Sequence, residues 1–275
     1  MQQSDFHNWE KGIFSVVGEL GGPDSTDEVQ YYRRDHSGVN YPGNIYTQDQ
    51  ISYKWNSHGF RCNEFQENTR NILCLGDSFT VGLGVPVEDT WPGQVGKLFD
   101  PSVEVYNLGL CAGSLDYVLR AIYKTVDVLK PEAIFILAPL VSSRELPIKK
   151  RMITYKPSAI IEDNASTPFD SLIPLLLDPT FISYTNTRNT LLIKEICKAR
   201  HIPVSIASLE NFSIEDFKNE SAAEFLKFTT TVQRVETHGI GAELNLPFGR
   251  DGFHFGKEWN GFVAQQLMKE LSNGK

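Results

Sequence analysis

Three features are scarce in this 275-residue sequence: cysteine pairs, long apolar runs and blocks of basic residues. The four cysteines lie far apart and none belongs to a C-x-x-C pair, so a zinc site of that type is not expected. No apolar run approaches the roughly 18 residues that span a bilayer. The N-terminus is polar and lacks the apolar segment of a signal peptide, so we expect a cytoplasmic protein without a membrane partner.

Positive charge is limited as well. Lys and Arg number 26 against 34 Asp and Glu, which gives a formal net charge of −8. Nucleic acids and anionic membranes bind proteins through clustered positive charge, so neither is expected as a partner. No group of His, Asp and Glu has the spacing of metal ligands, and no cofactor is expected. The apolar share of 41% fits a soluble globular chain with a full core.

From residue 71 onward, apolar segments of strand length alternate with helical patterns. The segment 133–138 is apolar throughout, as expected of a central parallel strand covered on both faces. The alternation as a whole predicts an α/β fold with a parallel sheet between two layers of helices. We expect strands over 71–75, 103–108, 133–138, 204–207 and 242–246, and helices over 87–99, 114–129, 187–200, 221–235 and 257–271.

Two segments depart from this alternation. Residues 1–65 are rich in Tyr, Asn, Gly and charged side chains, and within them only 51–55 alternates like a strand. Residues 141–185 contain five prolines among scattered apolar residues, and long irregular segments inside a domain are usually functional or mobile. The sequence therefore predicts an N-terminal extension (1–65) packed on a main domain (66–275), which carries a lid-like insertion at about 141–185.

A possible nucleophile directly follows the first predicted strand, in the sequence Gly76-Asp77-Ser78. A glycine permits a tight turn, and a serine on a strand-to-helix turn is exposed at the carboxyl edge of a sheet. The alternative interpretation is a polar turn in which Ser78 caps the following helix.

A possible base stands near the end of the chain, in Asp251-Gly252-Phe253-His254. A histidine can take the proton of a serine hydroxyl, and a nearby carboxylate can orient the imidazole. The three-residue spacing lets one turn carry both groups. Loops that follow parallel strands meet at one edge, so we expect His254 beside Ser78.

Together, Gly76-Asp77-Ser78 and Asp251-x-x-His254 resemble the first and last motif blocks of the SGNH (GDSL-type) hydrolase superfamily. The resemblance implies a three-layer α/β/α sandwich with a mostly parallel, flavodoxin-like sheet. It also implies a catalytic triad of Ser78, His254 and Asp251. Asp77 competes for the role of the acid, but the family's aspartate beside the serine usually makes structural hydrogen bonds. We therefore keep Asp251 as the acid, and we count Asp77 among the expected substrate-binding residues.

The family also implies donors for an oxyanion. The backbone N–H of Ser78 is the first, and the second follows the second strand, at Ala112 or Gly113. The third is usually an asparagine after the third strand, which this sequence lacks. Ser142, Ser143 or Arg144 could replace it as oxyanion or substrate-binding residues. For Arg144 the alternative is a surface ion pair with Glu145 or with another neighbour.

The stretch from Asn56 to Arg61 is similar to a segment that often precedes the first block in bacterial SGNH-like proteins. We expect it to form a hairpin packed on the main sheet, with a substrate role for Arg61 as the alternative.

The function implied by the resemblance is serine-dependent hydrolysis of a short-chain, acetyl-type ester of a carbohydrate or small metabolite. That ester is the one partner we expect. Two alternatives stay open: an O-acyltransferase that uses the same triad, and a binding protein of the same fold with weak or no catalysis. The absent third-block asparagine favours the binding protein, whereas the presence of all three triad residues favours an enzyme.

Overall fold

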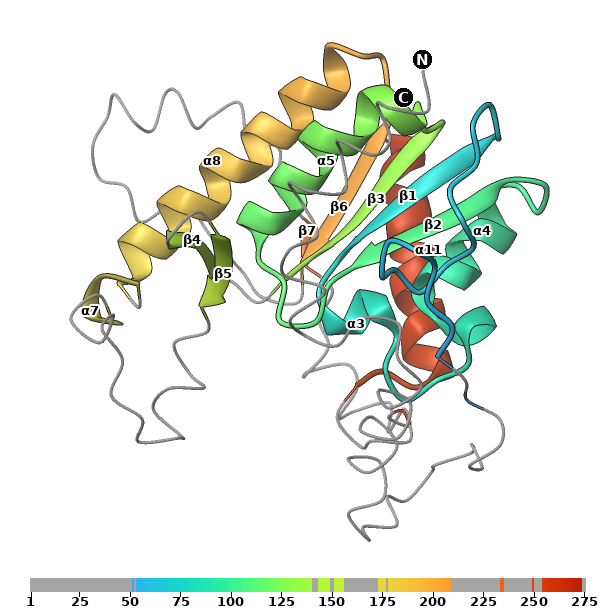
Figure 1. Cartoon of the computed structure of the whole chain (residues 1–275), viewed down its shortest axis with the longest axis horizontal. Coiled ribbons are helices and arrows are strands. Elements are labelled where there is room, and N and C mark those ends of the chain that lie inside the picture. Colours follow the sequence, from blue (N-terminus) through green and yellow to red (C-terminus); the bar gives the residue numbers. More distant parts are fainter. Residues whose placement is uncertain are drawn as a thin grey trace, which may run out of the picture.

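A computed structural model describes residues 51, 53–139, 143–148, 151–155, 173–176, 178–208, 233–234, 249 and 254–273 of the chain. In this part of the chain, a five-stranded sheet lies between two layers of helices (Figure 1). Every neighbouring pair of its strands is parallel. The strand order is β2 (Glu104–Gly109), β1 (Asn71–Gly76), β3 (Ala133–Ala138), β6 (Val204–Ser208) and β7 (Gln233–Arg234).

This order is the flavodoxin-like one, and it confirms the fold class predicted from the sequence. The chain moves from β1 to β2 on one side and from β1 to β3 on the other. In such sheets the functional crevice lies beyond the carboxyl ends of the strands where the order reverses, which here is the end of β1. The strand order therefore predicts that functional residues lie directly after Gly76.

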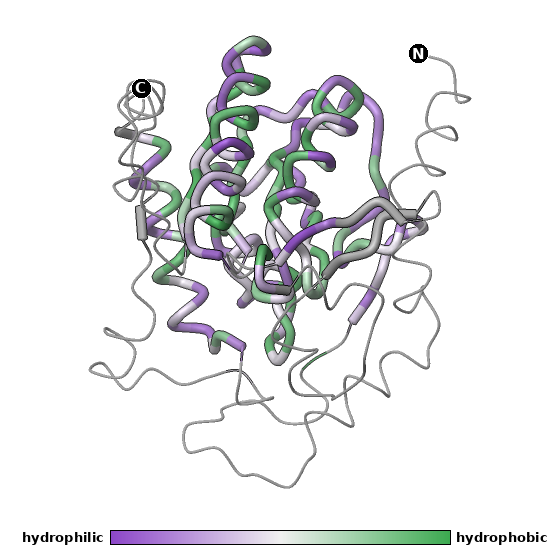
Figure 2. Tube along the Cα trace, turned by 90° about the vertical axis from the view of Figure 1, so that its left-hand side faces the viewer, coloured by the Kyte–Doolittle hydropathy of each residue, from purple (hydrophilic) through white to green (hydrophobic). Residues whose placement is uncertain are grey.

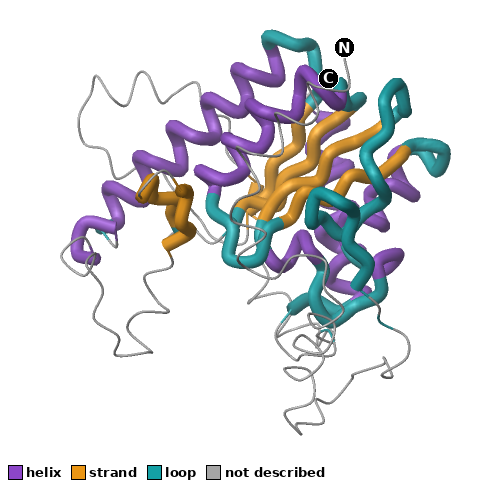
Figure 3. The backbone as a smooth tube through the Cα atoms, viewed as in Figure 1, coloured by secondary structure: helices purple, strands orange, loops and turns teal. Residues whose placement is uncertain are grey.

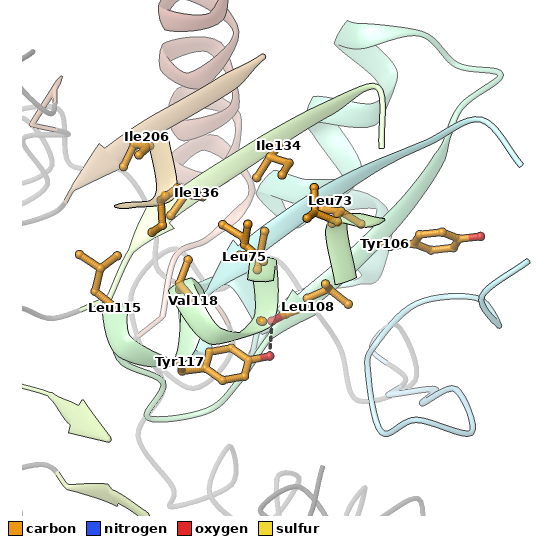
Figure 4. Close-up of a cluster of buried hydrophobic side chains, with 14 of the residues drawn as sticks. Leu73, Leu75, Tyr106, Leu108, Leu115, Tyr117, Val118, Ile134, Ile136 and Ile206 are labelled. Atoms are coloured by element: carbon orange, nitrogen blue, oxygen red, sulfur yellow. Dashed lines mark hydrogen bonds between the residues drawn. The ribbon is translucent and has the colours of Figure 1, made fainter. Parts of the chain in front are cut away.

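One face of the sheet is covered by α5 (Leu115–Leu129) and α8 (Pro179–Lys198). Alternate residues of each strand point to this face, and the side chains of β1 and β3 pack there against the apolar stripe of α5 (Figure 4). Ser114 caps α5 as expected, because its hydroxyl accepts a hydrogen bond from the backbone N–H of Tyr117 at 3.2 Å. Figure 4 also shows the Tyr117 hydroxyl donating to the carbonyl of Leu108, at 2.9 Å.

The other face is covered by α4 (Trp91–Phe99) and α11 (Lys257–Asn273). Ile72 and Cys74 of β1 point to this side, where they meet Trp91 and Val263. Both hydrophilic and hydrophobic residues occur along each helix, as expected of helices with one face on a core (Figure 2). The expected helix over 87–99 is in fact the short 3-10 helix η2 (Val87–Asp89) followed by α4.

The region of the expected insertion contains its own small sheet. The antiparallel strands β4 (Arg144–Ile148) and β5 (Arg151–Tyr155) lie beside α8 and apart from the main sheet (Figure 3). The short helix α7 (Ile173–Leu176) precedes α8. The helix α8 starts at Pro179 rather than at 187, because Asp178 caps it and a proline suits the first helical position.

Two further local predictions differ from the structure. Residues 51 and 53–55 form no strand; Ile51 and Tyr53 instead pack against Val81 and Leu83. The helix expected over 221–235 is wrong at Gln233–Arg234, which form β7 because the edge of β6 offers them backbone hydrogen-bond partners. The rest of that helix and the strand expected at 242–246 lie outside the described residues.

Within the described ranges, no helix combines the length and apolar character needed to cross a bilayer.

Candidate active site

Ser78 is the first residue of α3 (Ser78–Val81), the short helix that follows β1 at the carboxyl edge of the sheet (Figure 1). The N-cap of α3 is Asp77, and not Ser78: its carboxylate accepts a hydrogen bond from the backbone N–H of Phe79 at 3.0 Å. A Cβ atom at Gly76 would lie 2.5 Å from the carbonyl oxygen of Leu137, so only glycine fits this turn. The turn leaves the Ser78 hydroxyl at the end of a buried central strand.

His254 lies next to this hydroxyl. Its Nε2 atom is 2.8 Å from the Ser78 Oγ atom, although 176 positions separate the two residues in the sequence. The His254 side chain is buried, and its ring packs against Phe79 with 4.9 Å between the ring centroids. The Phe79 ring in turn packs against the Phe255 ring, with 4.5 Å between the ring centroids. The imidazole is therefore held by aromatic packing within hydrogen-bonding distance of the serine.

The structure does not describe the residue expected as the acid of the triad. Asp251 lies outside the described residues, as does Ser142. Asp77 is buried, and its carboxylate makes the capping hydrogen bond to Phe79. This contact agrees with a structural role for Asp77.

The loop that contains Ala112 and Gly113 is joined to the turn that carries Ser78. The Leu110 N–H donates to the Gly76 carbonyl at 3.1 Å, and a Cβ atom at Gly113 would lie 3.2 Å from the same oxygen. The Gly113 N–H itself donates to the Leu110 carbonyl at 2.7 Å. Ala112 has a φ of 57°, the left-handed region that non-glycine residues rarely adopt.

Asn107 fixes the relative position of these two segments. Its amide Nδ2 donates to the carbonyl of Thr80 in α3 at 2.7 Å, and its Oδ1 atom accepts from the Gly109 N–H at 2.9 Å. One buried side chain thus connects α3 with the start of the 110–114 loop.

Arg144 is buried and its guanidinium contacts α8. Nη1 donates to the carbonyl of Ser143 at 2.7 Å and to Asn186 Oδ1 at 3.2 Å, and Nη2 donates to the carbonyl of Ile182 at 3.4 Å. Burial lowers the pKa of Arg144, and the nearby carboxylate of Asp116 partly opposes that effect. The alternative of a surface ion pair with Glu145 is wrong, because Arg144 is buried and Glu145 pairs with Arg120.

Glu145 instead pairs with Arg120 of α5. The Arg120 Nη2 atom lies 2.5 Å from Glu145 Oε1, and the pair is largely shielded from solvent. Beside it, Asp116 Oδ2 accepts from the Glu145 N–H at 3.2 Å, while Asp116 Oδ1 accepts from Asn189 Nδ2 at 2.7 Å. Asp116 therefore connects the first turn of α5 with β4 and α8. Nothing in the sequence distinguishes Asp116 from an ordinary acidic residue in a first helical turn.

Arg61 and Tyr53 are further residues near the site whose roles the sequence did not reveal. Arg61 is buried and donates to the carbonyl oxygens of Val81, Gly82 and Val85, which follow Ser78 closely. Its guanidinium carbon lies 4.4 Å from the centre of the Tyr53 ring.

In the part of the chain that the structure describes, no group of three or more His, Cys, Asp or Glu residues is arranged to hold a metal ion.

No family model and no curated protein matches the chain. Among solved structures it is similar to the psychrotrophic esterase EstA from Pseudoalteromonas sp., at 12% identity and a TM-score of 0.44, covering 74% of this chain and 98% of that one. It is also similar to a member of the lipolytic protein G-D-S-L family from Veillonella parvula, at 14% identity and a TM-score of 0.40, covering 73% and 97%. A third is a carbohydrate acetylesterase family member from Sinorhizobium meliloti, at 13% identity and a TM-score of 0.35, covering 73% and 96%. These solved structures, to which the chain is similar, are thus esterases and lipolytic proteins.

Proposed function

We propose that this chain is a serine-dependent hydrolase of carboxylic esters, with Ser78 as the nucleophile and His254 as the general base. The observation that carries the proposal is the 2.8 Å separation of His254 Nε2 and Ser78 Oγ at the carboxyl edge of the sheet. A serine hydroxyl is a weak nucleophile unless a base takes its proton, and imidazole is suited to that task near neutral pH.

The geometry supports a two-step reaction. Ser78 Oγ forms a bond to the acyl carbon while its proton moves to His254 Nε2. The bond between the acyl carbon and the alcohol oxygen then breaks, and the same proton goes to that oxygen, which leaves an acyl group on Ser78. In the second step His254 takes a proton from water, the hydroxide adds to the acyl carbon, and the bond to Ser78 Oγ breaks with return of the proton to the serine. The products are the carboxylic acid and the free enzyme.

Asp251 is the acid of the proposed triad, because it stands three residues before His254 in the sequence. Its carboxylate would accept the Nδ1–H of the imidazole, which leaves Nε2 free to take the serine proton, and it would stabilise the imidazolium that forms. Asp77 has a different role in this scheme, since its carboxylate caps α3.

The proposed oxyanion donors are the backbone N–H groups of Ser78 and Ala112, each worth about 3 to 4 kcal/mol in such sites. Ala112 is preferred to Gly113, whose N–H donates to the Leu110 carbonyl. The hydrogen bonds of Arg144 to Ser143 and α8 argue against its use as a third donor. The proposed substrate is an ester of a short-chain, acetyl-type acyl group with a carbohydrate or small metabolite. This choice of substrate rests on the motif resemblance alone.

Labelling with a fluorophosphonate probe tests the proposal. We expect one adduct, located by peptide mass spectrometry on Ser78 and absent from Ser78→Ala. Ser102→Ala is the matched control, because Ser102 is an exposed serine that hydrogen-bonds Asp100. It should label like the wild type. Absence of an adduct on Ser78 in the folded wild-type protein would refute the proposal and favour a binding protein.

A further inference from the structure

The segment that follows α3 bonds Ser78 directly and is linked to His254 through Gly249. We name residues 82–85 the seat loop. The Gly82 N–H donates to the carbonyl of Ser78 at 3.0 Å, so the loop is connected directly to the serine. Gly82 and Gly84 have φ values of 77° and 78°, which other residues adopt only with strain. The loop therefore has an unusual backbone conformation, which contacts with other residues must stabilise.

Arg61 holds the start and the end of the seat loop. Its Nη1 atom donates to the carbonyl oxygens of Val81, at 3.2 Å, and of Gly82, while Nη2 donates to the carbonyl of Val85 at 2.9 Å. The last carbonyl groups of a helix have no partner inside the helix, and the planar guanidinium can serve several at once. Burial lowers the pKa of Arg61 to about 10, so the side chain keeps its charge at neutral pH.

Tyr53 holds the middle of the loop. The Gly84 N–H donates to the Tyr53 hydroxyl oxygen at 2.8 Å, and the Tyr53 ring lies against the Arg61 guanidinium at 4.4 Å. Both side chains are buried, and they support each other through a cation–π contact. Together they fix one donor and three acceptors of the backbone between Val81 and Val85.

Gly84 of the seat loop contacts Gly249, which is hydrogen-bonded to His254. A Cβ atom added to Gly249 would lie 3.0 Å from the carbonyl oxygen of Gly84, so the two backbones are in close contact. The Gly249 N–H donates to the carbonyl of His254 at 2.8 Å. A movement of the seat loop would therefore act on Ser78 through Gly82 and on His254 through Gly249.

From these contacts we infer that Arg61 and Tyr53 are positioning residues, which set the Ser78–His254 geometry through the seat loop without touching the reacting atoms. The inference rests on the proposed hydrolase function. Misplacement of catalytic groups by about 1 Å costs roughly 100-fold in rate, so a small change in the loop has a measurable effect. A purely structural role for the two residues would instead lower stability and leave the rate of the folded protein unchanged.

Tyr53→Phe tests the inference, because it removes one hydroxyl and keeps the ring on Arg61. Tyr106→Phe is the matched control: Tyr106 is also buried, and its hydroxyl accepts one backbone N–H, from Gln66 at 3.0 Å, away from the seat loop. Each variant loses one hydrogen bond to a backbone N–H, which is buried at Tyr53 and partly buried at Tyr106, so Tyr53→Phe should lose at least as much stability as the control. Only Tyr53→Phe should slow fluorophosphonate labelling of Ser78, by about 10-fold or more.

Amide exchange followed by NMR separates this inference from the proposed function. In Tyr53→Phe the Gly249 amide should exchange at least about 10-fold faster than in the wild type, whereas Tyr106→Phe should leave it unchanged. A wild-type protein that fails to label refutes the hydrolase, and the exchange rates still decide the role of the seat loop. Equal Gly249 exchange in the two variants would overturn the inference, and so would equal labelling rates of the two variants when the wild type labels.

Discussion

Asn260 connects α4 and α11, the two helices that cover one face of the sheet, and its replacement gives a prediction whose size follows from the structure. Its Oδ1 atom accepts from the Trp91 N–H at 2.8 Å, and its Nδ2 atom donates to the carbonyl oxygens of Phe255 and Gly256, each at 2.9 Å. Asn260→Ala removes all three hydrogen bonds from a buried position. At about 1 kcal/mol net for each, the free energy of unfolding should fall by about 3 kcal/mol.

Chemical denaturation measured by tryptophan fluorescence, with circular dichroism as a second probe, gives this difference directly. Asn63→Ala is the control, because the amide of Asn63 donates to the Glu104 carboxylate at 3.2 Å in an exposed position. It should change the free energy of unfolding by less than about 0.5 kcal/mol. If Asn260→Ala costs less than about 1 kcal/mol beyond this control, the three bonds do not hold the start of α11 as described.

Three further predictions concern charged residues. Asp251→Asn should lose much more esterase activity than Asp77→Asn among variants that remain folded, and the reverse order of their kcat values would reassign the acid. The bond from Arg200 lowers the pKa of Asp127, so its stabilisation is present above the unfolded pKa and is lost as pH falls. The stability difference between wild type and Arg200→Gln should therefore shrink as unfolding is measured from pH 6 down to about pH 2, and a constant difference would contradict it. Arg144→Ala should lower the melting temperature and change KM equally for anionic and neutral esters; a rise in KM for anionic esters alone would show that Arg144 binds substrate.

The sheet could be predicted because burial on both faces leaves a direct trace in the sequence. The apolar run 133–138 and the strand before Gly76 need covering on two sides, and only helices in the intervening segments can provide it. The start of α8 could not be predicted in this way, because the residues at its start do not carry a helical pattern that stands out in the sequence. Pro179 suggests a helix breaker when considered alone, but it occupies the first helical position after the capping residue Asp178.

The pairing of Ser78 with His254 could be anticipated because both lie in motifs at the ends of regular elements, and parallel strands gather such ends at one edge. The burial of Arg61 could not. An arginine is normally exposed, and its partners here are three backbone carbonyl groups about 20 residues further along, which no side-chain pattern reveals. The alternative of an ion pair between Arg144 and Glu145 failed for the same reason, since the partners of Arg144 belong to the backbone and to Asn186 on α8.

The central claim is that Ser78 carries the acyl group during turnover. The most direct measurement mixes the protein with p-nitrophenyl acetate and follows both p-nitrophenolate release and peptide masses. We expect one acetyl group on Ser78 during turnover in the wild type, and neither that group nor turnover in Ser78→Ala with an unchanged circular dichroism spectrum. A Ser78→Ala protein that keeps most of the wild-type rate would contradict the account.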